Sequence, residues 1–451
     1  MAGGIFTSMN KKIPGVYINT KSSGGAPVSI GDKGIVAIAK ALSWGPSGAI
    51  NVYVPGEDPT PLIGYDITSD DALFLRETLK GSDTTLGPKK VLLFRLSGTG
   101  GVKATATVGA LTATAKYVGK RGNDLTIIIE QDVDDTTLYH ISTVLSGDIV
   151  DKQDVKDLDD LVSNAWVDFT GTGTTITTTA GTALTTGADP TISTSDYSAF
   201  LTALEPFQFD IVAYDGSDST VVTALTSFVQ RMSNNLGKKC QGVVGNAAGV
   251  NTEWMINVAN GVKLADGTTL TAQQAVWWVA GSEAGAQYNQ SLTYAQYPGA
   301  AEANPKMTDA QVEAAIEAGK LCFLDEFDNV KVCTDIDSLT TYTPEKGQEF
   351  SKNRVMRTLN QICNDVYKQG TTYFIGKVNN DATGRNLLKA WIVGYLNEMQ
   401  ANSGIQNFTA DDVEVLPGNT IDSVIVNIAI QPVDSIEKIY VTVTVSVNTE
   451  V

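Results

Sequence analysis

The stretch Phe209-Asp-Ile-Val-Ala-Tyr214 is a short apolar run, of the kind that forms a buried strand in a parallel sheet. Helices are predicted on either side of it, over Ser195–Leu204 and over Val221–Leu236, and Gly237 ends the second one. A further short strand, Gln241–Gly245, comes next along the chain. Strands that alternate with helices in this order predict an α/β domain with a largely parallel sheet.

The same alternation extends toward both ends of the chain. Ile35–Ala39 and Val91–Leu96 have the composition of buried strands, and a helix is predicted over residues 69–81, capped by Thr68 or Ser69 and ended by Gly81. Downstream, a capped helix is predicted over 271–287. It carries Trp277 and Trp278, and we expect one ring in the core and the other packed on a neighbour, rather than a ligand platform.

Residues 99–192 have a different character. Ten of the nineteen residues from 170 to 188 are Thr, and glycines are interleaved among them. The segment holds six Lys and Arg against thirteen Asp and Glu, a net charge of −7. Thr favours exposed pleats, so we expect a β-rich insertion, a sandwich or a barrel built of short hairpins, with an acidic solvated surface.

The C-terminal hundred residues predict an α+β domain. Helices are expected over 345–368 and 382–401, because each segment has an apolar stripe at helical spacing. The first stripe is Phe350, Val355, Met356, Leu359, Ile362, Cys363 and Val366; the second is Leu387, Leu388, Trp391, Ile392, Tyr395, Leu396 and Met399. Two long strands are expected to follow.

The last predicted strand alternates strictly. One face carries Ile439, Val441, Val443, Val445 and Val447, and the other carries Tyr440, Thr442, Thr444, Ser446 and Asn448. No turn follows it that would allow pairing onward within the same chain. We therefore expect this strand to add to the sheet of another subunit.

Composition narrows the class of protein. The 451 residues are 42% hydrophobic and 18% charged, which argues against disorder, and no apolar run approaches the ~20 residues that cross a bilayer. No secretory signal is visible, so we expect a cytosolic chain. A net charge of −18 argues against nucleic-acid binding. Cys240, Cys322, Cys333 and Cys363 form no C-x-x-C pair, and we expect reduced, largely buried thiols.

The residues that carry chemistry are few. His140 is the single histidine, no G-x-S-x-G elbow is present, and no Gly-Lys pair continues as a phosphate-binding loop. The segment Gly242–Gly249 is better explained as a tight packing turn than as a dinucleotide site, and the paired acids Asp134-Asp135 and Asp159-Asp160 as a solvated surface. We assign no catalytic, cofactor-binding or metal-binding residue, expect no cofactor, and predict that the chain is not an enzyme.

Seven blocks of sequence resemble a known family. They are Pro14-Gly-Val-Tyr-Ile18, Ser43-Trp-Gly-Pro46, Val91-Leu-Leu-Phe-Arg-Leu-Ser-Gly98, Lys120-Arg-Gly-Asn-Asp-Leu-Thr126, Ile336-Asp-Ser-Leu-Thr340, Phe374-Ile-Gly-Lys-Val-Asn-Asn380 and Gln431-Pro-Val-Asp-Ser-Ile-Glu-Lys-Ile-Tyr-Val-Thr442. In this order they are similar to the sheath proteins of contractile phage tails and of R-type bacteriocins. They span almost the whole chain, and residues 99–192 match least well apart from the Arg-Gly-Asn block.

The resemblance implies a mechanical polymer. Subunits of this family stack as hexameric rings in a helical assembly around an inner tail tube, on a baseplate, and the tail tube, baseplate and tail terminator proteins are the implied partners. Contraction drives the tube through a bacterial envelope, for genome ejection into the host cell or for killing by a phage-tail-like particle. No direct nucleic-acid contact and no membrane insertion are implied. The location would be the virion tail, after assembly in the host cytoplasm.

The resemblance also implies that N- and C-terminal arms join neighbouring subunits by completing a shared sheet. The expected arms are residues 1–20, with Val16, Tyr17 and Ile18, and residues 436–451, with Ile439, Tyr440, Val441, Val443, Val445 and Val447. Lys21–Ala26 and Pro432–Ser435 would be hinges. Between the arms we expect a core start at 21–98, an outward-facing β insertion at 99–192, an α/β middle domain at 193–344 and a C-terminal α+β domain at 345–435.

A basic patch is a candidate tube-facing surface. Lys346, Lys352, Arg354 and Arg357 lie close together at the start of the predicted 345–368 helix, with Glu349 the one acid among them. A solvated helix face is an equal alternative. For the whole chain, two other readings stay open: an adhesive phage or surface protein that binds a receptor or glycan through its Thr-rich insertion, and a degraded subtilase-like hydrolase.

Overall fold

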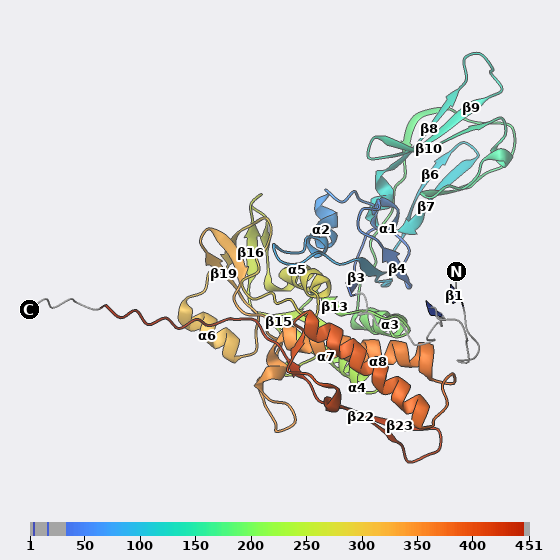
Figure 1. Cartoon of the computed structure of the whole chain (residues 1–451). Coiled ribbons are helices and arrows are strands. Elements are labelled where there is room, and N and C mark those ends of the chain that lie inside the picture. Colours follow the sequence, from blue (N-terminus) through green and yellow to red (C-terminus); the bar gives the residue numbers. More distant parts are fainter. Residues whose placement is uncertain (1–2, 5–15, 18–32, 446–451) are drawn as a thin grey trace, which may run out of the picture. The chain divides into compact units, whose positions relative to one another are not determined.

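The computed structural model describes residues 3–4, 16–17 and 33–445 (Figure 1). The contacts divide the chain into two units, residues 1–31 with 365–431, and residues 32–364 with 432–451. Each unit is described by itself.

A six-stranded sheet is the centre of the larger unit. β15, β14, β13, β3 and β5 run parallel, and β4 pairs antiparallel with β5 at the edge. The prediction of an α/β domain with a largely parallel sheet is confirmed. In order across the sheet, the strands are β15 (Met255–Val258), β14 (Gln241–Gly245), β13 (Ile211–Tyr214), β3 (Ile35–Lys40), β5 (Lys90–Arg95) and β4 (Ile50–Tyr53).

Both faces of this sheet are covered, and β3 supplies both cores. Val36 and Ile38 join one buried cluster and Ala37 and Ala39 the other, as the period of two in a strand requires. The first cluster contains α5 and α2, and the second contains α3 and α4. The helices that lie wholly within this unit are α1 (Thr60–Ile63), α2 (Leu73–Leu79, after a 3₁₀ turn at Asp70–Ala72), α3 (Thr194–Leu204), α4 (Ser219–Asn234), α5 (Ala272–Gly285) and α6 (Asp309–Glu317).

The two adjacent tryptophans of α5 are both buried. Trp278 stacks on Tyr297 with ring centroids 4.3 Å apart and donates its indole N–H to the carbonyl of Gly81. Trp277 donates to the carboxylate of Asp215 at 3.0 Å. The Gly242–Gly249 segment is also a packing feature, because a Cβ on Gly245 would lie 2.5 Å from the backbone of Gln273 on α5.

Smaller antiparallel sheets complete this part. One has the order β17, β16, β18, and the other is the β19–β20 hairpin. Their bounds are β16 (Gly261–Leu264), β17 (Thr269–Leu270), β18 (Ala300–Asn304), β19 (Phe323–Glu326) and β20 (Asn329–Val332).

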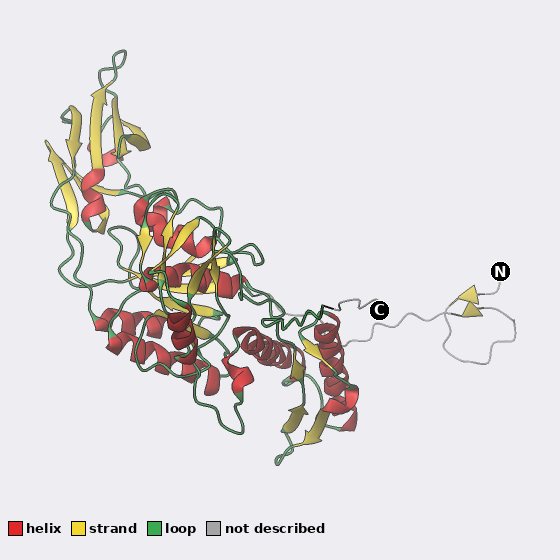
Figure 2. Ribbon diagram, turned by 90° about the vertical axis from the view of Figure 1, so that its left-hand side faces the viewer, coloured by secondary structure: helices red, strands yellow, loops and turns green. Residues whose placement is uncertain are grey.

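The insertion is a β-sandwich (Figure 2). One sheet has the order β11, β7, β6 and the other β10, β9, β8, β12, and they share one apolar core. The Thr-rich stretch contributes the last residue of β11 and the whole of β12, and its other residues are irregular or form bends and isolated bridges. The strands are β6 (Lys103–Val108), β7 (Leu111–Val118), β8 (Leu125–Gln131), β9 (Tyr139–Leu145), β10 (Asp148–Val155), β11 (Val167–Thr170) and β12 (Thr179–Ala183), with 3₁₀ turns at Lys120–Asp124 and Leu158–Asp160.

A buried joint connects the sandwich to the central sheet. Trp44, fully buried, stacks on Trp166 with centroids 5.2 Å apart and meets Tyr117 edge-on. Arg95, 2% exposed, donates to the carbonyls of Leu42, Gly45 and Val118. The Ser43–Pro46 and Val91–Gly98 blocks therefore serve packing at this joint.

The C-terminal region contains two long helices and short strands. Its elements are α7 (Asn353–Gln369), a π turn at Gly370–Phe374, α8 (Ala382–Ala401), β21 (Ile405–Gln406), a 3₁₀ turn at Ala410–Asp412, β22 (Val413–Pro417), β23 (Val424–Ile428) and β24 (Gln431–Pro432). β22 and β23 form an antiparallel hairpin, and α8 packs on β22.

The predicted start of the first helix is wrong by eight residues. α7 begins at Asn353, after a 3₁₀ turn at Gln348–Ser351. Lys352 is extended and pairs with Ile336, and Asp337 donates its backbone N–H to the carbonyl of Ser351. This long-range pairing takes the residues before Asn353 out of the helix.

Candidate interaction surfaces

The described part of the C-terminal segment, residues 436–445, forms no strand and no helix. Its apolar side chains are open to solvent: Ile439 is 79% exposed, Tyr440 90%, Val441 76%, Val443 80% and Val445 81%. Such a run of exposed β-branched residues is unusual for a surface that stays uncovered. Val447 lies outside the described residues.

Only part of the expected N-terminal arm is described. Val16–Tyr17 (β2) pairs parallel with Gly3–Gly4 (β1). Ile18 lies outside the described residues. The assignment of Val16, Tyr17 and Ile18 to an inter-subunit arm stays a prediction.

One side chain of the C-terminal segment is held by the body of its unit. The Glu437 carboxylate accepts hydrogen bonds from the hydroxyls of Thr293 at 2.7 Å and Thr334 at 3.3 Å, and forms an ion pair with Lys352. The Glu437 side chain is 15% exposed and that of Lys352 23%. A cavity of about 560 Å³ is lined by both residues and by Thr293.

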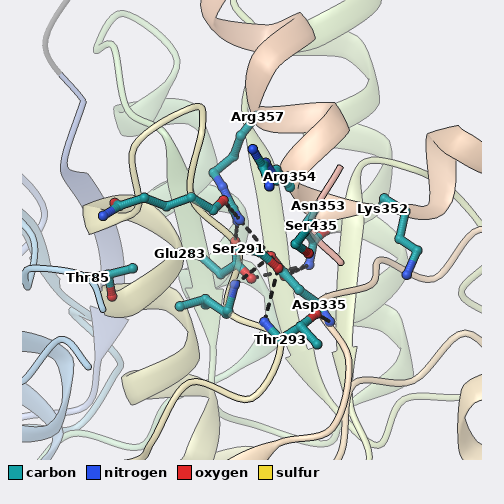
Figure 3. Close-up of polar contacts among 12 residues, drawn as sticks. Thr85, Glu283, Ser291, Thr293, Asp335, Lys352, Asn353, Arg354, Arg357 and Ser435 are labelled. Carbon is teal, nitrogen blue, oxygen red and sulfur yellow. Dashed lines mark hydrogen bonds and ion pairs between the residues drawn. The ribbon is translucent and has the colours of Figure 1, made fainter. Parts of the chain in front are cut away.

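A buried ionic cluster lies next to this contact (Figure 3). Arg357 on α7 pairs with Glu283 on α5 and, at 2.6 Å, with Asp335, and all three side chains are at most 2% exposed. Asn353 donates to both carboxylates, at 3.2 Å to Glu283 and 2.8 Å to Asp335. The backbone N–H of Leu292 donates to Asp335 at 2.9 Å.

The two carboxylates of this cluster differ in electrostatics. Burial raises the pKa of Glu283 well above its usual value, against the opposing effect of Arg357. Burial would also raise the pKa of Asp335, but Arg357 and several hydrogen bonds outweigh it and hold that pKa below its usual value. Asp335 is therefore the more strongly ionised partner of Arg357.

The four cations of the expected basic patch do not share one exposed helix face. Arg357 is interior, and Lys346 and Lys352 precede α7 and pair with Glu253 and Glu437. Arg354 is partly covered, and burial lowers the pKa of its guanidinium. The sequence alone could not identify these acidic partners, because they come from segments that are distant along the chain and meet the cations only in the fold. Arg357 is thus removed from a tube-facing surface.

The structure places His140 on the sandwich and all four cysteines outside it. The imidazole of His140 lies between Asp154 and Asp132 on the sandwich, and hydrogen bonds to these carboxylates raise its pKa. All four cysteines are free; Cys240 and Cys322 are buried, Cys333 is half-buried and Cys363 is exposed, so the expectation of buried thiols holds for two of them. Within residues 33–445 and the two short N-terminal strands, no group of three or more His, Cys, Asp and Glu is placed to hold a metal ion.

Side chains occupy part of the sheet edge at the carboxyl ends of β3 and β13, where open α/β sheets commonly bind ligands. Lys40 at the end of β3 forms an ion pair with Asp215 after β13, and its ammonium lies 4.7 Å from the centre of the Trp277 ring. A cavity of about 350 Å³ beside them is lined by Tyr65 and Asp70, among others. Among the described helices, none is long and apolar enough to cross a membrane.

Comparisons with known proteins cover most of the chain. Family models match in order the phage tail sheath protein Gp18 domain III N-terminal region at residues 33–96, the beta-sandwich domain at 99–189, the central domain at 191–338 and the C-terminal domain at 345–446. The crystal structure of a sheath tail protein from Desulfitobacterium hafniense is 41% identical, with a TM-score of 0.85, over 96% of this chain and 100% of that one. The chain belongs to the phage tail sheath family.

Other sheath proteins agree with this assignment. The sheath tail protein of Listeria innocua is 36% identical with a TM-score of 0.77, over 92% of this chain and 96% of that one. The phage-like element PBSX protein XkdK of Bacillus subtilis is 34% identical over 99% of this chain and all of that protein. The contracted helical sheath of the anti-feeding prophage, 13% identical with a TM-score of 0.57 over 96% of this chain and 99% of that one, shares the fold. The family supports a structural sheath role in a phage tail or a phage-tail-like particle.

Proposed function

We propose that this chain polymerises as stacked hexameric rings around an inner tail tube and contracts to drive that tube through a bacterial envelope. The supporting observation is the segment 436–445, which carries exposed, alternating apolar residues and forms no strand within its own described chain. A second copy of the chain is the occupant that such a segment suits, because a repeating polymer offers every arm the same acceptor edge.

Strand addition gives the polymer both strength and freedom to move. Backbone hydrogen bonds between the arm and a neighbour's sheet persist while the rigid bodies change their side-to-side contacts. Lys21–Ala26 and Pro432–Ser435 would absorb the dihedral changes as hinges. No nucleotide site is required by this mechanism, since the energy of contraction is stored at assembly.

A tube-facing role is proposed for Lys346, Lys352 and Arg354. The side chain of Lys346 is 45% exposed despite its pairing with Glu253. Exposed charge pairs are weak and undemanding in geometry, so they suit contacts that hold the extended state and then slip. Reversal of Lys346 to Glu is expected to weaken association with tube protein, and salt is expected to weaken the wild-type association.

The central experiment removes the arm. The variant lacking residues 436–451 is expected to remain a folded, soluble monomer that forms no tubes in negative-stain microscopy, and removal of residues 1–20 is expected to act likewise. Circular dichroism and the melting temperature report the folded state of each variant. Tubes of normal length from either truncated chain would contradict the proposal.

A further inference from the structure

Glu437 differs from its neighbours in the C-terminal segment. Among the described residues 436–445 it alone is partly buried, and its carboxylate has three partners. The partners come from separate places in the sequence: Thr293 follows α5, Thr334 follows β20, and Lys352 directly precedes α7. These three residues form the seat of Glu437, and they come together only when the chain folds.

This seat is connected to the buried ionic cluster. The Thr293 hydroxyl that donates to Glu437 also accepts the backbone N–H of Asp335 at 2.9 Å. Asp335 in turn pairs with Arg357 on α7. Accepting this N–H occupies a lone pair of the Thr293 oxygen and leaves the hydroxyl proton to be donated to Glu437.

We propose that Glu437 is a positioning residue that fixes the point and the direction in which the C-terminal segment leaves its own subunit toward a second copy of the chain. The inference rests on the proposed strand exchange and deepens it. In an extended segment, Ile439, Val441 and Val443 lie on the same side as Glu437. A fixed Glu437 thus determines which face of the arm carries these residues, and a slip of one residue would exchange the faces.

The anchor also shortens the search for the acceptor sheet. Residues 438–445 span at most about 26 Å at 3.3 Å per residue, so an arm held at Glu437 samples a small volume. A smaller volume raises the effective concentration of the arm at a neighbour's edge. If the ion pair were lost, the free chain would begin earlier, near Pro432–Ser435, and the strand would add with a larger loss of entropy.

The first test uses unassembled protein, so it does not depend on polymerisation. Spin labels at Tyr440→Cys and at Glu313→Cys on α6, in a Cys363→Ser background, report the distance between the segment and its own unit. We expect a narrow distribution for the otherwise wild-type chain and a broad one for Glu437→Gln and for Lys352→Met. The matched control is Lys438→Met, which removes an adjacent charge and is expected to leave the distribution narrow.

The second test measures assembly by sedimentation at increasing protein concentration. We expect Glu437→Gln to raise the critical concentration about 3- to 10-fold, the range given by one partly buried, charge-assisted contact. The double variant Glu437→Lys with Lys352→Glu restores an ion pair of opposite orientation. The double variant is expected to recover part of the loss in assembly. If the substitutions acted only by destabilising the fold, combining two of them would not restore assembly.

The outcomes separate the anchor from the arm. If the chain without residues 436–451 polymerises normally, the proposed strand exchange fails, while the spin-label distances still test the anchor. If that truncation abolishes assembly but Glu437→Gln keeps the wild-type distances and critical concentration, the anchor is overturned. A broad distribution in Lys438→Met as well would also overturn it.

Discussion

At the scale of single residues, Arg357 shows how strongly the interior of this protein depends on ionic contacts. Two carboxylates, Glu283 and Asp335, surround its guanidinium, and none of the three side chains is more than 2% exposed. Removing the cation would leave buried acids without their counter-charge. The cluster therefore constrains α7 and α5 together, and its network continues to the seat of Glu437.

We expect Arg357→Ala to lower the free energy of unfolding by about 3–5 kcal/mol, the usual cost of breaking a buried ion pair. Arg231→Ala is the matched control, since the Arg231–Glu205 pair is 43% and 40% exposed and should contribute less than about 1 kcal/mol. Urea denaturation followed by circular dichroism measures both. Equal losses in the two variants would show that the cluster contributes little.

The single histidine gives a pH prediction. Hydrogen bonds to Asp154 and Asp132 raise the pKa of His140 in the folded chain above its usual 6.5. The stability that these contacts contribute is fully present below pH 6.5 and is lost as the pH rises through the folded pKa. An NMR titration of the imidazole C–H resonance is expected to give a value above 6.5, lowered by Asp154→Asn. A titration unchanged by this substitution would contradict the assignment.

At the scale of elements, the joint between the sandwich and the central sheet depends on close backbone approach. Gly119 has φ +127°, and a Cβ there would lie 2.1 Å from the carbonyl oxygen of Ser43. Gly147 also has positive φ, at +102°, but faces open space. Both glycines adopt a positive φ that other residues avoid. A comparison between them therefore isolates the contact of the added Cβ with the Ser43 backbone, which only Gly119 would make.

Gly147→Ala is expected to cost about 1–2 kcal/mol from backbone strain, and Gly119→Ala clearly more, because the Ser43 backbone has to move. Thermal unfolding followed by tryptophan fluorescence reports the joint directly, since Trp44 and Trp166 stack there. A melting temperature of Gly119→Ala equal to that of Gly147→Ala would mean that the joint adjusts without cost.

The elements also show how far the sequence predicts the structure. The α4, α5 and α8 helices were predictable to within a few residues, because capping residues and apolar periodicity are local signals. The residues before Asn353 were not, since their pairing with 336–337 is long-range. The alternation in 439–445 is visible in the sequence, whereas the seat of Glu437 is not: its partners at 293, 334 and 352 become neighbours only in the fold.

At the scale of the whole molecule, the sandwich is an insertion with adjoining ends. Thr99 and Thr191 exchange two backbone hydrogen bonds, of 3.0 and 2.9 Å, so the chain enters and leaves the sandwich at one place. The strands of the central sheet come from residues 35–95 and 211–258, on either side of the insertion. The sheet therefore has no need of the sandwich for its own hydrogen bonds.

We expect a chain in which residues 100–190 are replaced by Asn-Gly to fold and to form tubes, because a two-residue turn suits an antiparallel pair such as Thr99 and Thr191. Trp44 should be changed to Gln in this variant, since its partners Trp166 and Tyr117 are lost with the sandwich. Arg95 keeps its bonds to Leu42 and Gly45 and loses only the one to Val118. Negative-stain microscopy measures the result, with the chain lacking residues 436–451 as the control that forms no tubes. A folded monomer that never polymerises would mean that the sandwich carries inter-subunit contacts, and that its proposed position on the outside of the particle is wrong.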